Sequence, residues 1–172
     1  MKSNTIIIVI LGLVAVSILF IFGYISKGSS SASIQGISGL NSSSDNFLTV
    51  SENVYNFGLI SMKNGDVTKE FTITNSTDED INIIRLETSC MCTRAYLVLS
   101  DGTARGPFGM AGMGGITTTN EIIKASESRI LRVVYDPNAH GPAGVGKIDR
   151  FITLKDSKQR TQIFEIKAIV TP

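Results

Sequence analysis

The sequence of 172 residues contains only two cysteines, one histidine and no tryptophan. With no third cysteine, a conventional framework of several disulfides is excluded. Aromatic residues make up only 7% of the chain, so a hydrophobic core has to be built mainly from Ile, Val, Leu and Phe. No cysteine follows the long apolar run near the start, which excludes a bacterial lipoprotein anchor. No glutamate lies just inside that run, as a type IV pilin-like start would require.

An excess of charge of one sign is also lacking. Lys and Arg number 16 and Asp and Glu number 15, which gives a formal net charge of +1, and no run of like charge occurs. The chain therefore lacks the basic footprint of a nucleic-acid-binding protein. Catalytic motifs are missing as well, because Ser89 has no nucleophile elbow and the glycine-rich stretch lacks the Gly-Lys-Ser/Thr ending of a phosphate loop. These absences predict a protein that does not bind nucleic acid and is not an enzyme.

What the chain does contain near its start is one long hydrophobic run. Residues 6–25 carry no charge, and only Ser17 is clearly polar. A helix of about 20 residues, rising about 1.5 Å per residue, spans the roughly 30 Å hydrocarbon core of a bilayer. Residues 31–33 resemble the cleavage site of a secretory signal, but the run is too long for one and Lys27 intervenes. We therefore predict an uncleaved transmembrane anchor at 6–25, preceded by a short head at 1–5.

Lysines lie on both sides of this run, at Lys2 and Lys27, so the positive-inside rule is nearly balanced. The short head and the large polar remainder favour a cytoplasmic amino terminus and a C-terminal domain outside the cytoplasm. We therefore expect a single-pass protein of the cell membrane. Residues 26–46 are dominated by Ser and Gly, the composition of a flexible linker, and the folded domain is predicted to occupy 47–172.

From residue 47 onward the chain reads as short strands separated by turns. In the segment 68–75, Phe71 and Ile73 alternate with polar residues, and 128–135 alternates in the same way. No long segment of this part has helical periodicity. Many short strands at this spacing predict an all-β domain, an Ig-like β-sandwich. The other predicted strands cover 47–51, 54–58, 81–93, 94–99, 147–154 and 162–170.

The strand expected at 81–93 contains both cysteines. Ile84 and Leu86 share one parity and Cys90 and Cys92 continue it, so an extended strand would turn both sulfurs to the inner face. On such a strand the two Cβ atoms lie roughly 6–7 Å apart. A disulfide needs a separation of about 3.8 Å. A direct bridge is therefore predicted to be strained, and free thiols or thiolate metal ligands are expected.

Three roles stay open for the cysteine pair: buried thiols packed as small hydrophobes, a soft-metal site, or a redox couple. A Gly/Met-rich insertion at about 100–120 either packs on the end of the sandwich or folds its methionine thioethers, which are soft ligands, over the thiolates. His140 is expected to be an exposed loop residue. The residues considered for a Cu(I) site are Cys90, Cys92, Met110 and Met113.

Several short motifs resemble those of a known family. They are the Tyr-Asn-Phe-Gly run at 55–58, the Ser-Cys-Met-Cys-Thr run at 89–93 and the Tyr-Asp-Pro run at 135–137. Over roughly 50–170 the chain resembles the bacterial domain-of-unknown-function family 1573, although Met91 stands where that family usually has Gly. The resemblance implies an Ig-like sandwich related to PapD-like and major-sperm-protein-like domains, in an extracytoplasmic setting. It implies no established activity.

Together these features predict a membrane-anchored, extracytoplasmic Ig-like module that binds or scaffolds a protein partner in the cell envelope, without catalysis. The edges of such sandwiches can accept a strand from a partner, and PapD-like domains are known for that mode. One alternative is binding of Cu(I) or another soft metal through the Cys-x-Cys pair and the loop methionines. The other alternative is a thiol redox protein.

Overall fold

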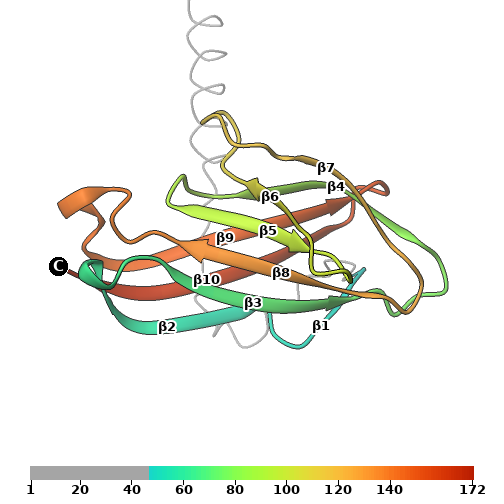
Figure 1. The fold of residues 1–172 in the computed structure, drawn as a ribbon, viewed down its shortest axis with the longest axis horizontal. Helices are drawn as coiled ribbons and strands as arrows, with labels where there is room; N and C mark the ends of the chain where they lie inside the picture. Colours follow the sequence, from blue (N-terminus) through green and yellow to red (C-terminus); the bar gives the residue numbers. More distant parts are fainter. Residues whose placement is uncertain (1–46) are drawn as a thin grey trace, which may run out of the picture. The chain divides into compact units, whose positions relative to one another are not determined.

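The structure, a computed structural model, describes residues 47–172 (Figure 1). This part of the chain forms ten strands and two short 3-10 helices. The strands lie in two five-stranded sheets that pack face to face, with the hydrophobic core between them. The prediction of an all-β sandwich is therefore confirmed.

Each sheet brings together strands that are distant in the sequence. The first sheet has the order β1-β3-β8-β5-β6, and its neighbouring strands are all antiparallel. The second sheet has the order β2-β10-β9-β4-β7, and its β2–β10 pair is parallel. The elements are β1 (Thr49–Val50), β2 (Val54–Ser61), η1 (Met62–Asn64), β3 (Val67–Thr74), β4 (Ile81–Thr88), β5 (Thr93–Val98), β6 (Ala104–Phe108), β7 (Thr118–Ile123), β8 (Ser128–Tyr135), η2 (Gly141–Gly144), β9 (Gly146–Asp156) and β10 (Thr161–Thr171).

Alternating side chains build the core, because every second residue of a strand points to the same face. In β8 the residues Leu131, Val133 and Tyr135 point inward and are at most 1% exposed. Phe71 of β3 meets Phe164 of β10 across the two sheets, with ring centroids 5.1 Å apart. Burial of apolar surface, at about 25 cal/mol per Å², is the main force that holds the sheets together.

The predicted head at 1–5, anchor at 6–25 and linker at 26–46 lie outside the described residues, so these boundaries stay predictions. Between residues 47 and 172 the structure contains no helix long and apolar enough to cross a membrane.

Strand β2 extends further than the predicted strand at 54–58. Gly58 has a φ of +71°, a left-handed conformation that glycine adopts at little cost. Its amide donates to Asn56 Oδ1 at 2.9 Å, and the register of β10 against β2 shifts nearby, between Lys167 and Ile169. The chain therefore passes through an irregularity at Gly58 and then continues as a strand.

The predicted strand at 81–93 is corrected in two ways. β4 ends at Thr88, before either cysteine, and its register against its neighbours shifts just after Ile83. Because of this bulge, Ile81 and Ile83 are buried before it and Leu86 and Thr88 after it, so the predicted inward parity holds at Leu86 and Thr88 and fails at Ile84, which is only half-buried. One unbroken parity from Ile84 to the cysteines was therefore the wrong prediction, since one extra residue inverts the alternation of a strand.

The segment predicted as a Gly/Met-rich insertion at about 100–120 also contains strand structure. It contributes β6 to the edge of the first sheet and the start of β7 to the edge of the second. Pro107 lies within β6, and a proline has no N–H to donate, which suits an edge position. The high glycine content between these strands hid them from the sequence pattern.

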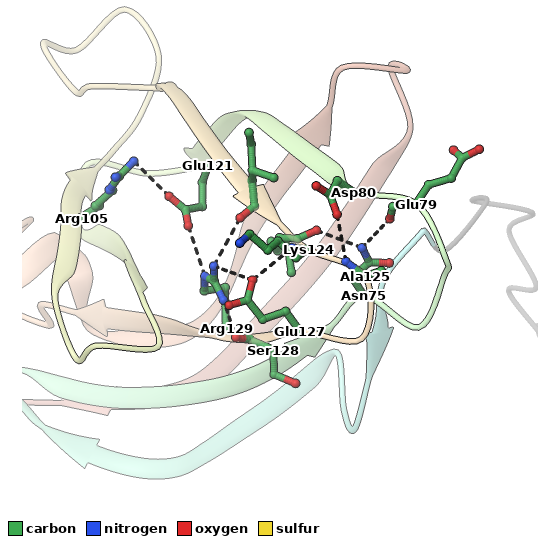
Figure 2. A network of polar contacts seen from close by, with 12 residues as sticks. Asn75, Glu79, Asp80, Arg105, Glu121, Lys124, Ala125, Glu127, Ser128 and Arg129 are labelled. Atoms are coloured by element: carbon green, nitrogen blue, oxygen red, sulfur yellow. Dashed lines mark hydrogen bonds and ion pairs between the residues drawn. The ribbon is translucent and has the colours of Figure 1, made fainter.

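A buried ionic network joins the edge strands β6 and β7 (Figure 2). Glu121 of β7 is 5% exposed and Arg129 of β8 is 7% exposed. Figure 2 shows Glu121 between two arginines, with its carboxylate oxygens 3.2 Å from Arg129 Nε and 3.0 Å from Arg105 Nη1. Glu127 accepts a further hydrogen bond from Arg129 Nη2 at 3.0 Å. These contacts tie the two sheets together along this side of the sandwich.

The same contacts set the ionisation of the network. Burial acts to lower the pKa of Arg129, but its hydrogen bonds to Glu127 and Glu121 outweigh burial and raise the pKa. The hydrogen bond from Arg129 also lowers the pKa of Glu127. A carboxyl whose pKa is lowered by folding stabilises the fold above its ordinary pKa and loses that contribution as the pH falls through the lowered value. Acidification below about pH 4 therefore weakens this side of the sandwich.

Candidate functional site

The two cysteines lie in a tight turn where the chain crosses from β4 of the second sheet to β5 of the first. The Thr93 amide donates to the Cys90 carbonyl at 3.1 Å and closes the turn. Thr88 Oγ1 donates to the carbonyl oxygens of Cys90 and Thr93, which lie at 3.1 and 3.0 Å. The Cα atoms of Cys90 and Cys92 are 5.2 Å apart, and their sulfurs form a disulfide bond.

This disulfide corrects the prediction of free thiols or thiolate ligands. The prediction assumed an extended chain through Cys92, on which the Cβ atoms lie too far apart for a bond. The turn at Met91 removes that obstacle, because it brings the two cysteines together. Both cysteines of the sequence lie in the described part, which contains no free cysteine.

The cysteine turn is fastened to both sheets. Ser89 and Phe151 of β9 are joined twice, since the Ser89 amide donates to the Phe151 carbonyl at 2.9 Å and the Phe151 amide donates to Ser89 Oγ at 2.9 Å. On the other side, the Asp136 amide at the end of β8 donates to the Cys92 carbonyl at 2.9 Å. The backbone around the disulfide is therefore held in place from both layers of the sandwich.

His140 reaches the disulfide from the loop after β8. Its Nε2 lies 3.1 Å from Cys90 Sγ, and the ligand atoms of Cys90, Cys92 and His140 all lie within 4.8 Å of one another. The histidine is exposed, as predicted, but it has a partner that the sequence analysis missed. The reason is a strand pairing that the sequence pattern does not show: β5 and β8 are antiparallel neighbours, with Tyr135 opposite Thr93. The loop after β8 therefore starts beside the cysteine turn.

Arg150 of β9 approaches the other sulfur. Its Nε donates to Cys92 Sγ at 3.1 Å, and its Nη1 donates to the Asp149 carbonyl at 2.9 Å. The same charge acts on Tyr135, whose pKa is raised by burial and by Asp136, against the opposing influence of Arg150. The sequence analysis had no reason to single out Arg150, because it lies 58 residues from Cys92 in the sequence.

The loop methionines lie beside the turn rather than over the disulfide. Met110 pairs through its backbone with Thr88, and the Thr88 amide donates to the Gly109 carbonyl at 3.1 Å. Met110, Met113 and Met91 line a pocket of about 310 Å³, and neither cysteine lines it. The metal role predicted for Cys90, Cys92, Met110 and Met113 stays a prediction. In the structure the side-chain nitrogens beside the two sulfurs belong to His140, 3.1 Å from Cys90 Sγ, and to Arg150, 3.1 Å from Cys92 Sγ.

The two sulfurs have unequal surroundings. Cys92 is 1% exposed, whereas Cys90 is only partly buried and Met91 between them is 54% exposed. An imidazole nitrogen lies beside Cys90, and a guanidinium donates to Cys92. Positive and hydrogen-bonding neighbours of this kind stabilise a thiolate relative to a thiol. Each sulfur of the disulfide therefore lies beside a nitrogen group of the kind that stabilises a thiolate.

A second feature is the open edge of the second sheet. β2 pairs with β10 on one side, and no described strand pairs with its other side. Leu59 of β2 is 71% exposed and lies next to Ile169 of β10, which is 52% exposed. Val54, at the start of β2, is 45% exposed. Large apolar side chains thus accompany an unpaired strand edge.

Two facing five-stranded sheets around one core define the class of this domain as an Ig-like β-sandwich. Within it, residues 48–100 match the model of the family described as "Protein of unknown function (DUF1573)". This match covers β1 to β5 and includes the whole cysteine turn. The resemblance to that family is therefore confirmed. No curated protein matches the sequence.

Solved structures resemble this chain at low sequence identity. A protein of unknown function from Porphyromonas gingivalis W83 is 14% identical, with a TM-score of 0.52, over 71% of this chain and 46% of that one. The chain thus spans less than half of that protein. PapD-like domain 7 of human CEP192 is 12% identical, with a TM-score of 0.42, over 80% and 96% of the two chains. The Pseudomonas aeruginosa CupB2 chaperone is 11% identical, with a TM-score of 0.38, over 71% and 55%.

Proposed function

We propose that this protein is a membrane-tethered binding module whose Ig-like domain, outside the cytoplasm, accepts an extended segment of a partner protein along β2. The observation that carries the proposal is the unpaired edge of β2. β2 is eight residues long, is fully part of the second sheet through β10, and leaves its other side unpaired in the described structure. An unpaired edge offers a row of backbone donors and acceptors to an added strand. Binding, not catalysis, is the role that this edge supports.

The other sheet edges are less suited to strand addition. β1 has only two residues. β6 contains Pro107, which cannot donate, and is joined to β7 by the ion pair between Arg105 and Glu121. Proline and cross-linked edges are devices that keep further strands from pairing. β7, at the other edge of the second sheet, has six residues and carries Glu121 of the same ion pair. Of the edges in residues 47–172, β2 with its eight residues is therefore the longest.

Exposed side chains near β2 indicate the chemistry of the partner segment. An added strand presents alternate side chains to one face of the sheet. Leu59 and Ile169 are neighbours on that face and are exposed by 71% and 52%. The segment that fits is an extended polypeptide with apolar residues at alternate positions, which would cover both side chains.

Peptides selected from a random library on the full chain in detergent provide the test. We expect selected peptides to bind the wild-type chain and to slow hydrogen exchange at the amides of β2. The substitution Leu59→Lys is expected to weaken binding about tenfold or more, because burial of one leucine side chain contributes about 1.5–3 kcal/mol. Affinities are measured by fluorescence polarisation with a labelled peptide.

The matched control is Ile122→Lys on β7, at the opposite edge of the same sheet, where the side chain is 49% exposed. This change introduces the same charge in place of another exposed aliphatic side chain and should leave peptide affinity unchanged. Peptides that bind both variants equally, or that protect amides only away from β2, would show that β2 is not the binding edge.

The tether is the second part of the proposal. The uncharged run at 6–25 supports a single-pass anchor that keeps the domain in the cell envelope, near its partner. We expect the full chain to stay with the membrane pellet after an alkaline carbonate wash, and a chain lacking residues 2–25 to move to the soluble fraction. Immunoblots of both fractions measure the distribution. Release of a shortened form of the full chain would instead indicate cleavage near residues 31–33.

A further inference from the structure

We propose that the Cys90–Cys92 disulfide is an exchangeable redox bond that oxidises a dithiol of a partner protein. This proposal rests on the cysteine turn and is independent of strand addition at β2. Four observations carry it: the disulfide itself, the partial exposure of Cys90, the nitrogen of His140 beside Cys90, and the guanidinium of Arg150 on Cys92.

Accessibility decides which sulfur is attacked. A thiolate attacks a disulfide sulfur in line with the bond, so the attacked sulfur has to be reachable and the other sulfur leaves. Cys92 is 1% exposed and is covered by the core, whereas Cys90 is partly exposed and lies beside the exposed Met91. The attacked atom is therefore Cys90 Sγ, and the leaving atom is Cys92 Sγ.

The exchange balances in two steps. In the first, a partner thiolate attacks Cys90 Sγ, the Cys90–Cys92 bond breaks, and a mixed disulfide forms between the partner and Cys90 while Cys92 leaves as a thiolate. In the second, the partner's other thiolate attacks the partner sulfur that is bonded to Cys90. The partner's disulfide forms, and Cys90 leaves as a thiolate. The partner loses two electrons and gains a disulfide. The two protons released by the partner thiols return to Cys90 and Cys92.

Two side chains favour this direction. Arg150 Nε lies 3.1 Å from Cys92 Sγ, so the leaving thiolate forms next to a permanent positive charge. His140 Nε2 lies 3.1 Å from Cys90 Sγ and can donate a hydrogen bond to the second leaving thiolate. Groups that stabilise the reduced form of a dithiol make its disulfide a better oxidant. The hydrogen bonds of the cysteine turn hold both sulfurs next to these two side chains.

The first experiment uses the wild-type full chain in detergent with reduced glutathione as the attacking thiol. After acid quenching and alkylation, peptide mass spectrometry locates the glutathione adduct. We expect the adduct on Cys90 to exceed that on Cys92 by more than tenfold while the far-ultraviolet spectrum stays that of a β-protein. An adduct mainly on Cys92, or reduction that occurs only together with unfolding, would overturn the proposal and define a structural disulfide.

The second experiment measures the equilibrium between disulfide and dithiol forms in glutathione buffers. Arg150→Gln is expected to shift the equilibrium constant about tenfold toward the disulfide, the effect of losing one hydrogen bond to a charged group. His140→Asn is expected to shift it in the same direction. Arg132→Gln is the matched control and should leave the constant unchanged. It removes an arginine of β8 that pairs with Glu70 of β3. Equal constants for Arg150→Gln and the wild type would contradict the role of Arg150 and with it the proposed direction.

Discussion

Replacement of Phe71 by alanine is expected to lower the free energy of unfolding of the domain by about 4 kcal/mol. Phe71 is 0% exposed, and its ring packs on that of Phe164 from the other sheet at 5.1 Å between centroids. The substitution removes most of a large apolar side chain and leaves a cavity between layers that are held by their neighbouring strands. Denaturation in urea, followed by circular dichroism on the full chain in detergent, measures the change.

Phe151→Ala is the matched control, because the same ring is removed from the outer face of β9. Phe151 is 43% exposed, and its hydrogen bonds to Ser89 of the cysteine turn are made by its backbone. We expect a loss below about 1 kcal/mol at this position. Equal losses for the two phenylalanines would contradict the placement of the core between the two sheets.

Replacement of Glu121 by glutamine is expected to cost about 3 kcal/mol of unfolding free energy, at the low end for breaking a buried ion pair. The change leaves Arg129, which is 7% exposed, without one of its two carboxylate partners. Arg129 keeps Glu127 and the carbonyl oxygens of Ser128 and Ile122, which limits the loss. Arg105 also loses its bond across the edges of the two sheets. The same urea denaturation measures the effect.

Glu79→Gln tests whether the loss of stability expected for Glu121→Gln comes from the burial of its ion pairs. Glu79 pairs with Lys158 at 2.6 Å, but both side chains are well exposed, and exposed ion pairs contribute little to stability. No measurable change is expected for this variant. If Glu79→Gln destabilised the domain as much as Glu121→Gln, the special role of the buried network would be refuted.

The regular strands were predictable because their pattern is local. The alternation in β3 and β8 follows from which residues are apolar, and the structure places both strands within one residue of the predicted ranges. Where an inserted residue or a special backbone conformation changes the alternation, the local pattern failed. The bulge after Ile83 broke the expected parity at Ile84, and Gly58 let β2 run past its predicted end.

The candidate site was only half predictable. Cys90 and Cys92 were chosen because both cysteines of the chain stand two residues apart, and that choice survives in the structure. Their state was mispredicted because the turn at Met91 depends on hydrogen bonds from Thr88 and Thr93 that no local hydrophobic pattern encodes. Met110 and Met113 were chosen for their chemistry and their nearness in sequence, but the structure places them in a pocket that neither cysteine lines.

By itself, the sequence determined the all-β class of the domain, because apolar alternation with a period of two is a property of neighbouring residues. Only the tertiary structure decided that His140 and Arg150, 50 and 58 residues away, meet the two sulfurs. It also decided that β2 is left with an open edge. The physical reason is strand pairing: β8 reaches the cysteine turn through β5, and β9 reaches it through β4. These long-range ladders form when the two sheets bury one common core.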